Sequence, residues 1–329
     1  MLTKENIEAR RTGVGASEAP CIVGVPGAWG SPLSVYEAKI GAAIAVEEND
    51  AMRRGNRMEP HILADLPEAT GLIIRPNDRL FRHPEHPFLI ATPDGFAYDG
   101  HTDENGQDKP VATVEVKAPM FRGDDWTDPD VNPRGVPDVY QVQCQYQMLV
   151  TGLPRAIIAA DIHPNADLWV YYLDADPETQ AILLEAVAAF WKRVEARDPP
   201  LDDLRPSDSD RLSRLLRQKS DALAIPTPDE ATELLQAAIN YDRASKAIRQ
   251  AEEIRDLAAA KLKAFIGEGA GIDLGSAKVS FRSNKPTPAV DWKKIVEELA
   301  PPADAINRHT EIRSRARPIR VTFKKEKAS

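Results

Sequence analysis

Glu115 and Lys117 stand two residues apart in an apolar, β-branched run, and this Glu-x-Lys pattern is the strongest constraint on the fold. Residues two apart on a β-strand point to the same face of the sheet. The two charged side chains are therefore expected to project together, while Val114 and Val116 pack behind them.

An aspartate precedes that run. Residues 91–95 read Ala-Thr-Pro-Asp-Gly, which predicts a turn that carries Asp94 at the end of the strand-like segment 88–91. Two carboxylates can hold a hard divalent cation through oxygen, and a lysine beside them can orient water or neutralise developing charge during phosphodiester hydrolysis. Taken alone, the pattern is weak, because Pro-Asp-Gly is a common turn and Glu-x-Lys is more often a solvated strand face.

Three further blocks surround the pattern, at residues 10–18, 52–60 and 139–152. In the first block the glycines suit a turn or a close backbone approach. Ser17 is a candidate N-cap for a helix that runs through Ile22, and a helix N-terminus near an arginine is an anion site. The alternative is a capped surface helix with solvated arginines. In the second block Glu59 lies on a predicted helix, either facing a cleft or exposed beside neighbouring arginines.

The third block contains glutamines at positions 141, 143, 145 and 147. Their spacing of two suits a strand, but the apolar positions between 139 and 151 also fit a helix. On a helix, Tyr140, Gln143 or Cys144, and Gln147 would share one face.

Taken in order, the five blocks resemble the YqaJ-type viral recombinase family, which includes the phage lambda exonuclease and belongs to the PD-(D/E)XK nuclease superfamily. The resemblance covers residues 1–200. It implies an α/β, restriction-endonuclease-like core in which helices flank a central mixed β-sheet. It also implies a metal-dependent exonuclease that degrades double-stranded DNA from the 5′ end and leaves 3′ single-stranded overhangs for recombination.

The resemblance also assigns residue roles. It implies that Asp94 bridges the metal ions, with Glu115 and the carbonyl of Val116 as further ligands; Mg²⁺ is the expected ion, with Mn²⁺ able to substitute. Lys117 becomes the catalytic lysine, and Glu59 and Gln143 support it. The remaining expected contacts are to the 5′-phosphate and the DNA, from Arg10, Ser17, Tyr140 and Gln145, with Arg11 as the alternative to Arg10 if the register is one residue off.

Composition is compatible with this interpretation. The net charge of −9 argues against a general nucleic-acid binder, and residues 1–200 carry 18 Lys+Arg against 31 Asp+Glu. The few arginines must then concentrate where DNA binds, because phosphate contacts dominate affinity. Two cysteines give no disulfide or zinc framework, and no run is long enough to span a membrane or serve as a signal peptide. A cytoplasmic location in a bacterial host cell, with a phage or prophage origin, is expected.

Asp198-Pro199-Pro200 predicts a domain boundary, so that residues 1–200 form the nuclease domain and residues 201–329 form an extension. Residues 232–266 predict a long helix with a heptad seam in which alanine alternates with larger apolar residues, which suits close antiparallel packing. A shorter helix at 208–220, a strand pair around Gly275 and a basic tail at 313–327 complete the extension. Oligomerisation, or docking of a partner or DNA, is its expected role.

Two other functions share these residues. An endonuclease of the same superfamily would keep every metal-site residue but would need no grip on a terminal phosphate. A non-catalytic DNA-binding or assembly module would be expected to have lost an acid or the lysine, and neither is lost here. By resemblance, the expected partners are double-stranded DNA ends, a single-strand annealing protein and further copies of the chain in a ring.

Overall fold

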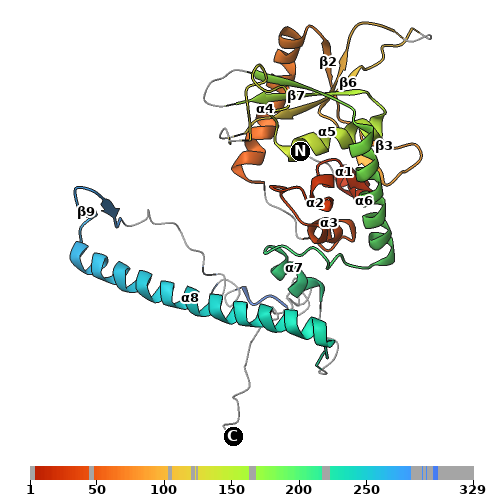
Figure 1. Cartoon of the computed structure of the whole chain (residues 1–329). Coiled ribbons are helices and arrows are strands. Elements are labelled where there is room, and N and C mark those ends of the chain that lie inside the picture. Colours follow the sequence, from red (N-terminus) through yellow and green to blue (C-terminus); the bar gives the residue numbers. More distant parts are fainter. Residues whose placement is uncertain are drawn as a thin grey trace. The chain divides into compact units, whose positions relative to one another are not determined.

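The computed structural model describes residues 4–43, 48–102, 106–119, 123, 125–162, 168–216, 223–282, 291, 294 and 299–302. The chain divides into two compact units, Met1–Leu216 and Arg217–Ser329 (Figure 1). The first unit contains a five-stranded and a three-stranded sheet and all five sequence blocks, and the second contains a long helix and a small hairpin.

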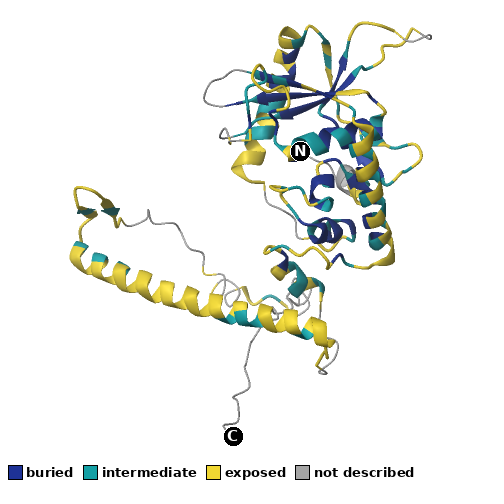
Figure 2. Ribbon diagram, in the orientation of Figure 1, coloured by how far each residue is buried: buried dark blue, intermediate teal, exposed yellow. Residues whose placement is uncertain are grey.

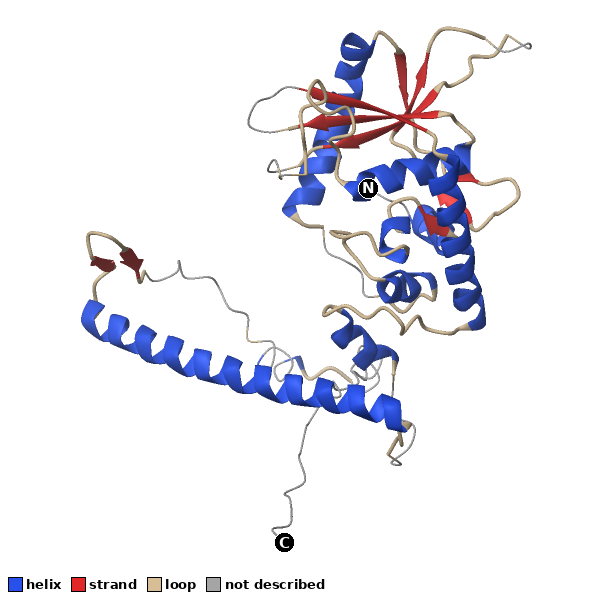
Figure 3. Cartoon of the chain, viewed as in Figure 1, coloured by secondary structure: helices blue, strands red, loops and turns tan. Residues whose placement is uncertain are grey.

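A five-stranded sheet forms the centre of the first unit (Figure 3). Its strand order is β2 (Ile73–Pro76), β5 (Gly95–Tyr98), β6 (Ala112–Lys117), β7 (Arg155–Asp161) and β8 (Leu168–Asp174). The β6–β7 pair is parallel and the other pairs are antiparallel, so the sheet is mixed and β6 is its middle strand. The predicted α/β core with a central mixed sheet flanked by helices is confirmed.

Helices cover both faces of this sheet. On one face, α4 (Asp50–Thr70) packs Ile62, Leu63 and Leu66 against Val114 and Val116. On the other face, α5 (Asp138–Thr151) packs against β7 and β8 in a cluster that includes Cys144, Met148, Ile158 and Ala160. The alternation of β6 therefore sends its valines to α4, and Glu115 contacts glutamines of α5. The predicted division of β6 into an apolar and a charged face is confirmed.

Residues 88–98 do not form one strand. β4 (Leu89–Ala91) belongs to a second, three-stranded sheet with β1 (Val14–Gly15) and β3 (Phe81–Arg82), whereas β5 belongs to the central sheet. Asp94 lies between the two sheets, and its backbone N–H donates to the carbonyl of Val114 at 3.0 Å. The Pro-Asp turn thus carries the chain from one sheet to the other, and the edge of β6 holds it in place.

The N-terminal segment packs on the three-stranded sheet through α1 (Lys4–Arg11), α2 (Ala19–Ile22) and α3 (Pro32–Lys39). Gly13 is required here, because a Cβ atom at this position would lie 2.5 Å from the carbonyl oxygen of Phe88. This close approach, predicted from the glycines, fixes residues 10–18 against β4. α6 (Pro177–Ala196) completes this layer with a buried row, Leu183, Val187, Phe190 and Val194.

The first unit continues past Pro200, where the sequence predicted its end, to Leu216. The added segment contains α7 (Asp208–Leu215), and Arg211 and Arg214 bind the fully buried carboxylate of Glu37 on α3 at 2.7 and 3.3 Å. Asp208 is also fully buried and accepts a hydrogen bond from Ser31 at 2.6 Å. The proline pair marks a loop, and these buried charges explain why the compact unit extends beyond it.

In the second unit, α8 (Pro228–Ile266) begins four residues earlier than the heptad pattern predicted, at a capping box of Thr227 and Glu230. β9 (Gly271–Asp273) and β10 (Lys278–Ser280) form the predicted antiparallel pair. The basic tail at 313–327 lies outside the described residues. No helix in the described part of the chain is both long enough and apolar enough to cross a membrane.

Candidate active site

Asp94, Glu115 and Lys117 meet at the middle of the central sheet. The Asp94 Oδ2 atom accepts a hydrogen bond from the backbone N–H of Val116 at 2.8 Å. Lys117 forms a close ion pair with Glu115, whose side chain is almost fully buried. The structure thus brings together the aspartate, the glutamate and the lysine that the sequence predicted as one site.

Two glutamines of α5 hold the Glu115 carboxylate from the other side. Gln143 Nε2 donates to Glu115 Oε1 and Gln147 Nε2 donates to Glu115 Oε2, each at 2.6 Å. The two positions lie one helical turn apart and share a face, as the helical interpretation of this segment predicted. The Oε1 atom of Gln147 is buried and has no hydrogen-bond partner among the described residues. An unpaired buried acceptor of this kind is costly unless a ligand or water satisfies it.

Burial and mutual repulsion shift the protonation of the acids. Burial, followed by the charge of Glu115, raises the pKa of Asp94 well above that of an ordinary aspartate. Burial and Glu115 also raise the pKa of Glu59, a half-buried residue of α4. Burial alone would lower the pKa of Lys117, but the carboxylates of Glu115 and Asp94 outweigh it and raise that pKa. The lysine therefore stays protonated, while Asp94 and Glu59 lose their protons less readily than free carboxylic acids.

Aromatic rings surround the lysine. Lys117 Nζ lies 4.7 Å from the ring centroid of Tyr140, a cation–π distance. The Tyr140 ring in turn contacts Trp29 at 5.6 Å and Trp126 at 5.5 Å between centroids. Trp126 is buried, whereas Trp29 is 73% exposed. Tyr140, which the sequence predicts to contact DNA, therefore holds the ammonium group of Lys117 against its ring.

A small cavity of about 110 Å³ joins the acids to the N-terminal segment. Arg10 and Ser17 line it together with Asp94, Glu115, Gln143 and Gln147. Arg11 does not line it; its guanidinium lies against Gly41, 3.5 Å from the position of a Cβ atom there. Between the two arginines that the sequence left open, the structure therefore favours Arg10.

A buried ion pair holds this segment in place. Lys39 Nζ donates to the carbonyl of Arg10 and to Glu18, each at 2.8 Å, and Glu18 accepts from the backbone N–H of Gly15 at 2.7 Å. Burial lowers the pKa of Lys39, and its pairing with Glu18 counteracts this effect. Lys39 and Glu18 thus fix the loop that carries both Arg10 and Ser17.

The predicted role of Ser17 as a helix cap was wrong. Ser17 does not cap a helix: α2 begins at Ala19, and Glu18 stands at its N-cap without a capping hydrogen bond. The carboxylate of Glu18 is needed by Gly15 and Lys39, so the predicted anion site cannot rest on this short helix. Ser17 is exposed and reaches the cavity from the preceding loop.

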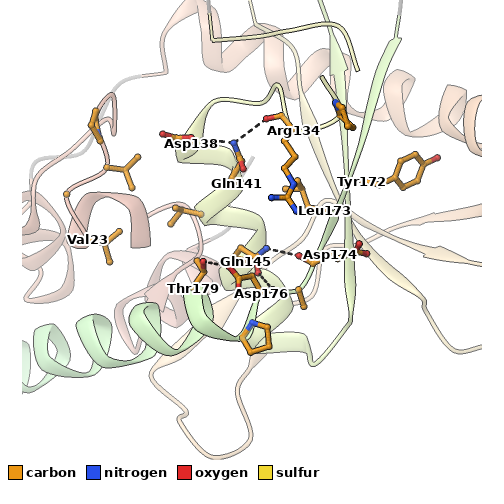
Figure 4. A pocket seen from close by; sticks show the side chains of 17 residues that line it. Val23, Arg134, Asp138, Gln141, Gln145, Tyr172, Leu173, Asp174, Asp176 and Thr179 are labelled. Atoms are coloured by element: carbon orange, nitrogen blue, oxygen red, sulfur yellow. Dashed lines mark hydrogen bonds between the residues drawn. The ribbon is translucent and has the colours of Figure 1, made fainter. Parts of the chain in front are cut away.

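Gln145 lies on the opposite face of α5 from the acids. It accepts from the backbone N–H of Asp176 at 2.9 Å and donates to the carbonyl of Asp174 at 2.8 Å. It lines a different cavity with Arg134 and Asp138 (Figure 4). The expectation that Gln145 lies near the active site is wrong. Gln145 is two residues from both Gln143 and Gln147, which is about half a helical turn, so its side chain points to the other side of α5. Gln147, which joins the site instead, was missing from the predicted site residues.

A second, larger cavity of about 760 Å³ opens on the other side of the acids. Glu59, Val116 and Lys117 line it, together with Trp29, Met52, Asn56 and Tyr140. Asp94 and Glu115 line both cavities. The carboxylates therefore separate a small polar space, with an arginine, from a wider space with aromatic and apolar walls.

The residues present fit a hard divalent cation. Within the described ranges, no three His, Cys, Asp or Glu side chains gather into a metal-binding group, but the carbonyl of Val116 adds an oxygen beside the two carboxylates. The raised pKa of Asp94 and the unpaired Gln147 oxygen both indicate a site that lacks a positive charge and a donor. Asp94, Glu115 and the Val116 carbonyl would hold the ion, and oxygen ligands of this kind suit magnesium.

An aspartate on a turn and a Glu-x-Lys on the middle strand of a mixed sheet form the arrangement that the resemblance to PD-(D/E)XK nucleases implied. Residues 5–154 match the family model of the YqaJ-like viral recombinase domain. Over 199 residues the chain is 25% identical to the protein YqaJ of Bacillus subtilis (strain 168). That match covers 59% of this chain and 57% of YqaJ, little more than half of its length.

Two solved structures are also similar. The alkaline exonuclease LHK-Exo from Laribacter hongkongensis is 25% identical, with a TM-score of 0.46, and the match covers 60% of this chain and 94% of that one. A phage-related exonuclease from Haemophilus somnus 129PT is 15% identical, with a TM-score of 0.44, covering 56% of this chain and 94% of that one.

Proposed function

We propose that this chain is a metal-dependent exonuclease that degrades double-stranded DNA from a 5′ end and leaves a 3′ single-stranded overhang. The observation that carries the proposal is the small cavity, in which Arg10 and Ser17 share a space with Asp94 and Glu115. This cavity of about 110 Å³ has room for a phosphate group beside an arginine, a serine and the two carboxylates. A grip on a terminal phosphate next to the cutting residues suits an exonuclease.

Each residue then has a task. Arg10 and Ser17 donate hydrogen bonds to the 5′-phosphate. Lys117 orients the attacking water or donates to a phosphoryl oxygen, with Tyr140 and Glu115 holding its ammonium group in place. Gln143 and Gln147 fix the Glu115 carboxylate, and Glu59 accepts protons at the wider cavity. Mg²⁺, or Mn²⁺ in its place, would polarise the phosphodiester and lower the pKa of a bound water.

The family supports further partners. A viral recombinase domain favours a role in homologous recombination, with a single-strand annealing protein that binds the exposed strand. It also favours a ring of subunits that encloses the DNA and acts in the cytoplasm of a bacterial host.

The deciding experiment is digestion of linear duplexes labelled at either the 5′ or the 3′ end, with and without Mg²⁺. Metal-dependent release that starts from 5′ ends is expected. Cleavage of covalently closed circular DNA would replace the proposal with an endonuclease. Binding of DNA without any cleavage by the folded protein in Mg²⁺ would replace it with a non-catalytic module.

Replacing Arg10 by methionine is expected to abolish the preference for 5′-phosphorylated ends. The guanidinium is the only arginine lining the small cavity among the described residues, and a charge-assisted contact to phosphate contributes roughly 1.5–3 kcal/mol. The measurement is the ratio of digestion rates on 5′-phosphate and 5′-hydroxyl duplexes. Arg11→Met is the matched control and should keep the wild-type ratio. An unchanged ratio in Arg10→Met would remove Arg10 from end recognition.

Replacing Gln147 by leucine is expected to lower the digestion rate and the affinity for Mg²⁺ by roughly 10–100-fold, the usual effect of losing a group that orients a metal ligand. Leucine cannot donate to Glu115 Oε2, so the carboxylate loses one of its two amide contacts. Gln145→Leu changes the same residue type on the opposite face of α5 and should leave both quantities unchanged. Equal effects of the two substitutions would mean that they only perturb the helix.

A further inference from the structure

The long helix α8 exposes an apolar stripe. None of its 39 residues is buried by any part of the chain that the structure describes, and Figure 2 shows the helix exposed along almost its whole length. Most of the stability of a helix in a protein comes from packing of one face. Large side chains nevertheless face solvent here; Ile248, for example, is 61% exposed.

The stripe follows a heptad with two alternating kinds of residue. One position carries mainly large side chains and the other mainly alanine. The first set is Leu234, Tyr241, Ile248, Arg255 and Leu262, and the second is Ala237, Ala244, Ala251, Ala258 and Phe265. A seam of this composition lets a second helix approach closely, because each large side chain can rest on an alanine.

Charge differs between the two ends of α8. Residues 228–241 contain Asp229, Glu230 and Glu233 and no basic residue, whereas residues 257–266 contain Lys261 and Lys263 and no acid. Two copies of α8 side by side in the same direction would place like charges together. In opposite directions, the acidic end of each copy would lie beside the basic end of the other.

We propose that α8 pairs with α8 of a second copy of this chain, in antiparallel orientation, through this stripe. Setting Ile248 of one copy opposite Ala251 of the other fixes the register. The same register then sets Tyr241 against Ala258 and Leu262 against Ala237, and it brings Leu234 against Phe265 at each end of the stripe. In a dimer with a two-fold axis, the same surface of each copy meets itself. The stripe and the two oppositely charged ends lie on one helix, so two copies of α8 complement each other without a different partner. The pairing is independent of the proposed nuclease activity.

Light scattering on the full chain tests the pairing. Ile248→Glu buries two opposed carboxylates near the two-fold axis and is expected to halve the mass of the wild-type assembly at micromolar concentration. Leu257→Glu is the matched control, since Leu257 is 60% exposed and lies on the side of α8 away from the stripe; it should keep the wild-type mass. Helical circular dichroism shows whether each variant is folded. Equal masses for wild type and Ile248→Glu would overturn the proposal.

Disulfide formation between two cysteine variants, one of which carries a tag so that the linked products differ in mass, tests the antiparallel orientation of the two α8 helices. Ala237→Cys and Leu262→Cys, mixed and oxidised, are expected to form the mixed dimer far more than either self-linked dimer. The native cysteines, Cys21 and Cys144, are buried and should not interfere. Self-linked Ala237→Cys dimers as the main product would indicate a parallel pair and contradict the proposal. Absence of any linked dimer would mean that another part of the chain covers the stripe, and would contradict it as well.

Discussion

Replacing Lys117 by methionine is expected to slow DNA digestion by about 10²–10³-fold, the usual loss when one preorganised donor to developing charge is removed. Lys117 pairs with Glu115 and lies 4.7 Å from the Tyr140 ring centroid. Methionine keeps the packing against Tyr140 but has no charge and no donor. Binding of duplex ends in Ca²⁺ should survive, because the small cavity with Arg10 is unchanged.

The measurement is single-turnover digestion with saturating enzyme, which separates chemistry from binding. Lys192→Met, an exposed lysine on α6, serves as the control for loss of a positive charge. Loss of the Lys117 charge should also strengthen metal binding, since a competing cation is gone. A Lys117→Met variant that digests DNA at the wild-type rate would remove the lysine from the mechanism.

Replacing Asp94 by asparagine is expected to abolish metal-dependent digestion while making the metal-free protein more stable at neutral pH. The Asn amide oxygen can still accept the hydrogen bond from Val116, so the turn should persist. The charge that repels Glu115 and Glu59 is lost. Burial, and then the charges of these two acids, raise the pKa of Asp94 in the wild-type protein. One substitution should thus separate function from stability.

The pH dependence gives the sign of this effect. A free aspartate titrates near pH 4, whereas folded Asp94 holds its proton to a higher pH. Between these values the folded protein binds more protons than the unfolded chain, so its stability falls as pH rises. Melting curves without metal should therefore show a gain for Asp94→Asn over wild type that is absent near pH 4 and grows toward neutral pH. A gain independent of pH would contradict this origin.

The sequence predicted the centre of the site because strand periodicity is local. Two residues on one strand must share a face, so Glu115 and Lys117 could be placed together without knowledge of the fold. The helix at 138–151 was harder, because glutamines at alternate positions fit a strand equally well. Once the segment is helical, geometry selects Gln143 and Gln147 and rejects Gln145.

Long-range contacts explain what the sequence could not predict. Lys39 and Glu18 lie far apart in the chain, yet their ion pair, and not a helix cap at Ser17, positions the residues around Arg10. The division of residues 88–98 between two sheets also depends on the partners of each strand. The choice between Arg10 and Arg11 needed the position of β4 and of Gly41.

The arginines that neutralise Glu37 limit where a C-terminal extension of this chain can be replaced by gene fusion. Arg211 and Arg214 stand beyond the Pro199-Pro200 loop, yet they compensate a carboxylate that is fully buried in the core. A gene fusion that joined a foreign extension at the prolines would leave the buried Glu37 carboxylate without its arginine partners. Losing the partner of a buried ion pair lowers the free energy of unfolding by about 3–5 kcal/mol. The place where one extension can be swapped for another therefore lies after Leu216, and the two arginines must be inherited with the catalytic core.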